Sequence, residues 1–180
     1  MHKMPINAPP HPFRLNLGSL LPQSIGYKRE FPFEYSTIQL DEAVALNNFK
    51  GLVIASRTPQ GLLVQGEFEG KIALDCVRCL KPYNHTLQWE ITELYVFNSR
   101  NASEDELILP DNAEVDLSEF IQEEAHLDLP FNPICKEDCL GLCQICGTDL
   151  NLGDCGHDDL PQEEPAEDEN SPFSGLKDLL

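Results

Sequence analysis

Residues 49–97, FKGLVIASRTPQGLLVQGEFEGKIALDCVRCLKPYNHTLQWEITELYVF, carry the clearest pattern in the chain. Runs of β-branched, aromatic and other apolar residues alternate with breaks that contain glycine, proline or asparagine, which is typical of strands joined by turns. The spacing predicts an antiparallel meander with runs at 49–57, 62–70, 71–79 and 85–97. Trp89 and Ile91 are expected to face its core.

Two earlier segments also alternate apolar and polar residues, which predicts a strand or a strand-like lead-in for the first and a strand for the second. They are FRLNLGSLL at 13–21 and FPFEYSTIQL at 31–40. Pro32 favours an edge strand or a place among the first residues of the strand, because proline has no backbone N–H to donate to a ladder. The stretch DEAVALNN, 41–48, is expected to form a short connection or a helical turn.

One helix is predicted after the meander, near 116–126 in the stretch DLSEFIQEEAHLDLP. Asp116 or Ser118 can cap its start, and His126 lies off the apolar face, where solvent is expected. The apolar face consists of Leu117, Phe120, Ile121 and Ala125. The expected fold class is therefore α+β and mainly antiparallel β, a β-meander or barrel-like domain with a short docked helix and a C-terminal zinc-knuckle module.

Seven cysteines are expected to be reduced thiols. The first 22 residues lack an uninterrupted apolar run, and no later stretch approaches the roughly 20 apolar residues of a membrane span. We therefore expect a soluble, intracellular protein that makes no membrane contact, in a compartment where disulfides are rare. Seven cysteines and one histidine would also supply eight metal ligands, whereas an odd number of cysteines cannot all pair as disulfides.

The motifs CVRC at 76–79 and CQIC at 143–146 indicate metal-binding knuckles, because each turn can direct two sulfurs at one ion. Cys143, Cys146, Cys155 and His157 enclose only the short loop GTDLNLGD, so they are expected to share one zinc. A second zinc would then bind Cys76, Cys79, Cys135 and Cys139. The alternatives are a local site formed by Cys135, Cys139, Cys143 and Cys146, a role for His85, or an iron–sulfur cluster.

The same ligand pattern disfavours an enzyme. A catalytic zinc keeps one position for water, whereas these residues fill both coordination spheres. The chain also lacks a deaminase H-x-E before its cysteine pair, a phosphate-binding loop and a G-x-S-x-G elbow. The residues thus predict a structural metalloprotein with no catalytic residues and no small-molecule substrate.

The net charge of −19, from 31 acidic and 12 basic residues, favours basic proteins as partners over bare nucleic acid. A local basic patch could still contact RNA. Composition predicts five parts: a flexible N-terminus at 1–10, the β domain at 11–132, a Cys-rich module at 133–157, an acidic disordered linker at 158–170 and a short motif at 171–180. In the last part, Phe173, Leu176, Leu179 and Leu180 could bind a partner as an apolar stripe.

The chain resembles the YceD family of large ribosomal RNA subunit accumulation proteins. The resemblance rests on CVRCL at 76–80, the acidic helix DLSEFIQEE, PICKEDCLGLCQICGTDLN at 133–151 and the closing SPFSGLKDLL. Family members commonly end the cluster with C-x-C, whereas this chain has Cys155, Gly156 and His157. Histidine is an acceptable zinc ligand, so the departure supports His157 as the eighth ligand.

This resemblance implies a role in the accumulation of 23S ribosomal RNA and in ribosome assembly. Together with the ligand pattern, it predicts a non-enzymatic, zinc-stabilised factor. Its contacts would be with a ribosomal protein, a pre-ribosomal particle or the RNA, in the bacterial cytoplasm or the plastid stroma. Two other functions remain open at this point. One is a thiol redox or metal-handling protein that uses Cys76 and Cys79, and the other is a zinc-ribbon adaptor of the transcription machinery.

Overall fold

The computed structural model of the chain describes residues 11–97 and 106–157. The segments predicted at 1–10, 158–170 and 171–180, with the stripe of Phe173, Leu176, Leu179 and Leu180, lie outside these residues. The chain divides into two compact units, Met1–Cys139 and Leu140–Leu180. The first unit therefore includes Cys135 and Cys139 from the module predicted at 133–157.

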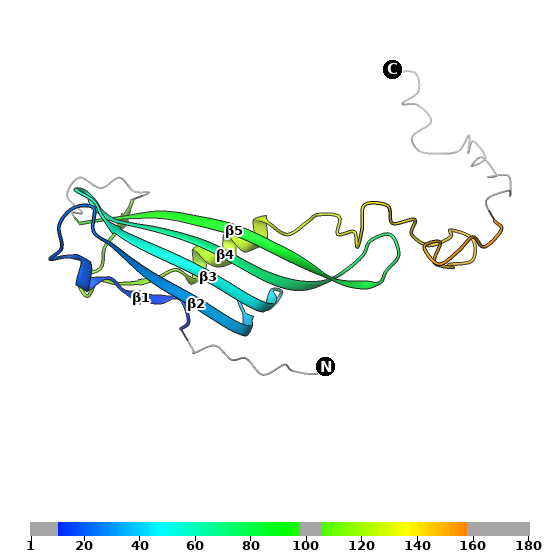
Figure 1. The fold of residues 1–180 in the computed structure, drawn as a ribbon, viewed down its shortest axis with the longest axis horizontal. Helices are drawn as coiled ribbons and strands as arrows, with labels where there is room; N and C mark the ends of the chain where they lie inside the picture. Colours follow the sequence, from blue (N-terminus) through cyan, green and yellow to red (C-terminus); the bar gives the residue numbers. More distant parts are fainter. Residues whose placement is uncertain (1–10, 98–105, 158–180) are drawn as a thin grey trace, which may run out of the picture. The chain divides into compact units, whose positions relative to one another are not determined.

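The first unit is built on a five-stranded sheet (Figure 1). Its strands are β2 (Lys28–Gln39), β3 (Ala45–Arg57), β4 (Gly61–Asp75), β5 (Pro82–Val96) and β6 (Leu107–Ile108), in that spatial order. Strands β2 to β5 form an antiparallel meander, and β6 pairs with β5 in parallel. The predicted meander is confirmed, and β2 with Pro32 lies at the sheet edge.

Strand β4 runs without interruption through Gly70, where two separate runs were predicted. That prediction was wrong because Gly70 serves close packing and not a turn. A Cβ atom built on Gly70 would lie 3.1 Å from Cδ1 of Leu46. The glycine thus lets the Leu46 side chain pack directly on the β4 backbone.

Two other segments also differ from their predictions. Strand β3 begins at Ala45, so the connection predicted at 41–48 is shorter than expected. The Asp41 carboxylate stabilises this turn, because it accepts hydrogen bonds from the backbone N–H of Ala43 at 2.7 Å and of Val44 at 2.9 Å. The strand predicted at 13–21 consists of a short β1 (Arg14–Asn16) followed by a 3₁₀ turn, η1 (Gly18–Leu20). Strand β1 pairs with β7 (Glu114–Asp116) in a separate two-stranded sheet.

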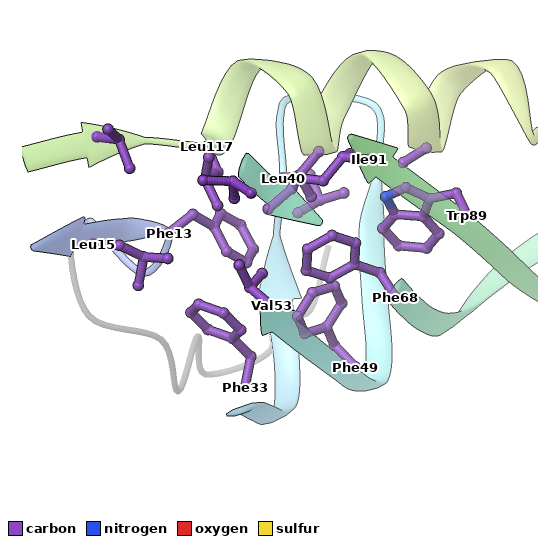
Figure 2. Packing of buried hydrophobic residues seen from close by; sticks show 14 of the residues in the cluster. Phe13, Leu15, Phe33, Leu40, Phe49, Val53, Phe68, Trp89, Ile91 and Leu117 are labelled. Carbon is purple, nitrogen blue, oxygen red and sulfur yellow. The ribbon is translucent and has the colours of Figure 1, made fainter. Parts of the chain in front are cut away.

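Aromatic side chains fill the core on one face of the large sheet (Figure 2). The ring of Phe68 stacks between Phe49 and Trp89, with centroid distances of 5.9 and 5.7 Å. Gly51 and Gly66 make room for this ring, because a Cβ atom on either would lie within 2.5 or 2.7 Å of it. Trp89 and Ile91 are buried, as predicted.

The helix α1 (Ser118–Leu127) packs against β5. Ile121 and Ala125 are fully buried, and Asp116 accepts hydrogen bonds from the backbone and hydroxyl of Ser118 at the helix start. His126 is exposed, as predicted, and its Nε2 contacts the Asp41 carboxylate. The fold is thus α+β and mainly antiparallel, as expected. Within residues 11–97 and 106–157, the one helix is too short and too polar to cross a membrane.

Candidate metal centres

The first knuckle joins β4 to β5 and holds Cys76 and Cys79. The backbone turns sharply here because Leu80 adopts a left-handed φ of 57°, and its N–H donates to the Cys76 carbonyl at 2.8 Å. Cys76 also donates its N–H to the carbonyl of Lys81 at 3.0 Å. The side chains of both cysteines are buried. The two long strands therefore hold this pair of sulfurs in a fixed place.

Cys135 and Cys139 approach this knuckle from the segment that follows α1. The N–H of Val77 donates to the Pro133 carbonyl at 2.8 Å, and Nη1 of Arg78 donates to the Cys139 carbonyl at 3.0 Å. As a result, Sγ of Cys76 lies 3.8 Å from Sγ of Cys139, and Sγ of Cys79 lies 3.7 Å from Sγ of Cys135.

These sulfur spacings fit a tetrahedral zinc site. With a zinc–sulfur bond of about 2.3 Å, the edge of the ligand tetrahedron is about 3.8 Å. A disulfide would require about 2.05 Å between sulfurs, and none of the seven cysteines is in a disulfide. All four sulfurs lie within 4.8 Å of one another. We call Cys76, Cys79, Cys135 and Cys139 the four-cysteine cluster.

Backbone N–H groups at the four-cysteine cluster favour the thiolate form of Cys76, which is the form that binds a cation. Burial raises the pKa of the Cys76 thiol, but backbone N–H groups of Cys79, Cys135 and Arg78 that donate to its sulfur lower that pKa to about 6 overall. Burial raises the pKa of Cys135 to about 12, together with its hydrogen bonds to the neighbouring cysteines. Four thiolates this close together would repel one another, which disfavours ionisation of all four, and a divalent cation would remove this repulsion.

The second knuckle lies in the other unit and has the same local design. Gly147 adopts a φ of 72° and donates its N–H to the Cys143 carbonyl at 2.9 Å, while Cys143 donates to the Thr148 carbonyl at 2.8 Å. A β-bridge between Leu142 and Asp149 closes the loop. Glycine suits this position because side chains disfavour a left-handed φ.

Cys155 and His157 complete the second group. Nδ1 of His157 lies 3.7 Å from Sγ of Cys143 and 3.3 Å from Sγ of Cys155. For zinc bonds of about 2.3 Å to sulfur and about 2.0 Å to nitrogen, the expected separation is about 3.5 Å. The ligand atoms of Cys143, Cys146, Cys155 and His157 all lie within 4.8 Å of one another. We call these residues the cysteine-histidine cluster.

Thr148 contributes to the electrostatics of the cysteine-histidine cluster. Its Oγ1 lies 3.2 Å from Sγ of Cys146, and its hydroxyl and backbone N–H lower the pKa of that thiol to about 6. Contact with the sulfur of Cys143 raises the pKa of Cys155 to about 11 and also raises the pKa of His157. The donor set of three thiols and one imidazole suits zinc.

The structure brings the eight candidate ligands together in the two groups predicted. The alternative site formed by Cys135, Cys139, Cys143 and Cys146 is wrong, since these residues divide between the two clusters. His85 lies outside both groups, on β5, with its ring 6.2 Å from that of Tyr83.

Two supporting residues were not predicted. Arg78 donates hydrogen bonds to the backbone carbonyls of Glu137 and Cys139, in the segment that carries Cys135 and Cys139. The hydroxyl of Thr148 forms a hydrogen bond with the sulfur of Cys146. The position of Thr148, two residues after the last cysteine of a CxxC motif, is a sequence signal for a hydrogen bond to that sulfur. No sequence signal placed Arg78 against Cys139, because that contact depends on the fold.

Comparison with known proteins places the chain in a family. The model of the family described as "Large ribosomal RNA subunit accumulation protein YceD" matches residues 64–180. This match covers both cysteine clusters. No solved structure matches the chain.

Curated relatives agree with this match. An uncharacterized protein of Mycobacterium tuberculosis is 35% identical over 95 residues, which cover 51% of this chain and 46% of the relative. A similar uncharacterized protein of Mycobacterium leprae is 30% identical over 95 residues, covering 51% and 44%. The large ribosomal RNA subunit accumulation protein YCED homolog 1 of Arabidopsis thaliana, a chloroplastic protein, is 37% identical over 52 residues, covering 28% and 16%.

The chain spans about half the length of the mycobacterial relatives and less of the plant relative. The family match, by contrast, extends from β4 through both cysteine clusters to the last residue. The chain therefore belongs to the YceD family of large ribosomal RNA subunit accumulation proteins.

Proposed function

We propose that this protein is a non-enzymatic, zinc-stabilised factor for the accumulation of 23S ribosomal RNA and for ribosome assembly. The observation that carries the proposal is the family match over residues 64–180. It acts through a ribosomal protein, a pre-ribosomal particle or the RNA, in the bacterial cytoplasm or, as the chloroplastic relative suggests, the plastid stroma.

The two clusters support a structural role for the metal. Each supplies four protein ligands, whereas a catalytic zinc keeps a position open for water. The four-cysteine cluster would hold the segment after α1 against the β4–β5 hairpin, and the cysteine-histidine cluster would fold the second unit. Zinc therefore maintains the shape of the protein and takes part in no reaction.

Deletion of the gene tests the proposal. We expect the ratio of 23S to 16S ribosomal RNA to fall and precursors of the large subunit to accumulate. Complementation with the wild-type chain should restore the ratio, whereas a chain with Cys76→Ser and Cys79→Ser should not. An unchanged ratio in the deletion strain would refute the proposal.

The redox and metal-handling alternative has less support. A thiol pair that cycles or transfers an ion needs access to a partner, yet Cys76 is 0% and Cys79 is 5% exposed. Titration with a thiol reagent separates the two functions. We expect full protection of Cys76 and Cys79 in the metal-loaded protein, and rapid labelling would favour the alternative.

A further inference from the structure

The two faces of the large sheet differ in what covers them. The aromatic core lies on one face, with α1 packed against β5. The opposite face, which we call the outer face, carries the exposed side chains of β3, β4 and β5. A hollow of about 650 Å³ lies on this face, lined by the exposed side chains of Lys50, Leu52, Glu67, Glu69, Gln88 and Glu90. The residues between them in the three strands, Gly51, Phe68 and Trp89, also border the hollow, although the side chains of Phe68 and Trp89 are buried in the core.

The strand register arranges the outer face in rows. In one row, Pro32 pairs with Leu52, Leu52 with Glu67, and Glu67 with Glu90. This row is thus apolar at one end and acidic at the other. Leu52 is 38% exposed, which is unusual for a central strand residue of an aliphatic type.

Glu67 and Glu90 stand directly opposite each other on neighbouring strands. Like charges in such a pair destabilise a sheet. Neither carboxylate forms an ion pair with any side chain in the described part of the chain. The sheet therefore keeps an unfavourable pair in the hollow, and an external cation would relieve it.

The neighbouring row adds to the negative charge. Glu69 lies beside Gln88, whose Nε2 donates to the Glu69 carboxylate at 2.8 Å, and Lys50 supplies the one basic side chain of the hollow. Three acidic groups against one basic group repel the phosphates of RNA. They attract lysine and arginine side chains, and Leu52 offers an aliphatic contact beside them.

We propose that the outer face is the docking surface for a lysine- and arginine-rich protein segment that also presents aliphatic side chains. This inference rests on the proposed function in one respect, namely that the partner is a protein of the assembling ribosome. The charged side chains of the segment would lie between Glu67, Glu69 and Glu90, and an aliphatic side chain would contact Leu52.

The test uses the purified full chain with its metal bound and a synthetic helical peptide of lysine and leucine as the probe. Binding is followed by backbone amide NMR shifts and by titration calorimetry at about 0.15 M salt. We expect the largest shifts at Leu52, Glu67 and Glu90. Shifts confined to other residues, for instance the acidic stretch 158–170, would overturn the proposal.

Two double variants that change the net charge equally distinguish peptide binding at the hollow from general attraction by the acidic protein. Glu67→Gln with Glu90→Gln should weaken peptide binding roughly fivefold to tenfold, as expected for the loss of two exposed ion pairs. Glu42→Gln with Glu119→Gln removes two acids outside the hollow and should change binding less than about twofold. Equal effects of the two variants would overturn the proposal.

Stability gives an independent measurement on the same variants. Relief of the Glu67–Glu90 repulsion should raise the thermal midpoint by up to about 4 °C, so weaker peptide binding cannot be attributed to unfolding.

A single-stranded RNA oligonucleotide serves as the second probe, and stronger binding of it than of the peptide at the hollow would also overturn the proposal. These binding measurements need no ribosome, so they test the docking surface separately from the proposed function. The docking surface can be refuted while the ribosomal RNA test supports the proposed function, and the proposed function can be refuted while the peptide still binds.

Discussion

Sγ of Cys76 lies 3.8 Å from Sγ of Cys139, although 63 positions separate the two residues in sequence. Cys76 follows the last residue of β4, whereas Cys139 ends the first compact unit. A metal ion between them would close a loop that contains β5, β6, β7 and α1. Such a long closed loop removes much entropy from the unfolded chain, so one ion can stabilise the whole unit.

Metal content should follow the division into two clusters. We expect two zinc ions per chain in the wild-type protein and one in Cys76→Ser with Cys79→Ser, measured by elemental analysis and native mass spectrometry. The matched variant Cys143→Ser with Cys146→Ser should also retain one. Cobalt substitution should distinguish the remaining sites, because four thiolates and three thiolates with an imidazole give different charge-transfer spectra. Two ions in either variant would contradict the assignment.

Chelation should affect the two units differently. None of the apolar side chains in the described part of the second unit is buried, and Leu140, Ile145 and Leu152 are more than half exposed. Metal binding, on the order of 10 kcal/mol in small zinc modules, would therefore be the main source of stability for residues 140–157. A chelator should give fast amide hydrogen exchange throughout residues 140–157.

The sheet should persist under the same treatment. Trp89 is the single tryptophan of the chain and is buried beside Phe68. Its emission should stay blue-shifted after metal removal, because the hydrophobic cluster around it, as formed by the described residues of the first unit, contains no metal ligand. A shift toward the emission of exposed tryptophan would indicate that the sheet also depends on the metal.

Gly66→Ala should destabilise the sheet. Its Cβ atom would lie 2.7 Å from the Phe68 ring, which is too close for an ordinary contact. We expect a loss of about 1–3 kcal/mol in the free energy of unfolding, as for other overpacked cores, measured by denaturant titration of Trp89 fluorescence. Phe68→Leu makes space at the same point, so the double variant should lose less than the sum of the two single variants.

Arg78→Ala should weaken the four-cysteine cluster without removing a ligand. Nη1 of Arg78 donates to the carbonyls of Cys139 and Glu137, which positions the second cysteine pair. Loss of such a supporting group typically lowers metal affinity about 10- to 100-fold. Competition with a zinc chelator measures this change, with Arg29→Ala as a control on a distant surface arginine. Equal affinities would mean that the cysteines alone set the geometry.

Local pattern was enough to predict much of this molecule. Alternation predicted the meander, and CxxC spacing with the short loop before Cys155 predicted both clusters. The errors arose where a residue's role depends on a distant partner. The local preference of Gly70 for turns predicts a break, whereas in the fold this glycine leaves space for the Leu46 side chain. In the same way, Arg78 could not be assigned before the fold placed Cys139 beside it.

The contact between His126 and Asp41 should make stability depend on pH. The hydrogen bond from His126 lowers the pKa of the Asp41 carboxyl below its ordinary value of 3.8, and the backbone N–H groups of Val44 and Ala43 lower it further. A carboxyl with a lowered pKa in the folded state stabilises the fold fully above its ordinary pKa. That stabilisation is lost as the pH falls below about 4, through the folded-state pKa.

We expect Asp41→Ala to lose about 1 kcal/mol in the free energy of unfolding at pH 7, a value discounted because both side chains are partly exposed. The difference from the wild type should shrink as the pH falls below about 4, since the carboxyl then binds protons more readily in the unfolded chain than in the folded protein. Trp89 fluorescence of the metal-free protein measures the difference at each pH without interference from zinc release. Asp41→Asn keeps an oxygen acceptor for Ala43 and Val44, so its loss should be smaller. A difference that does not change with pH would show that the charge of Asp41 contributes nothing.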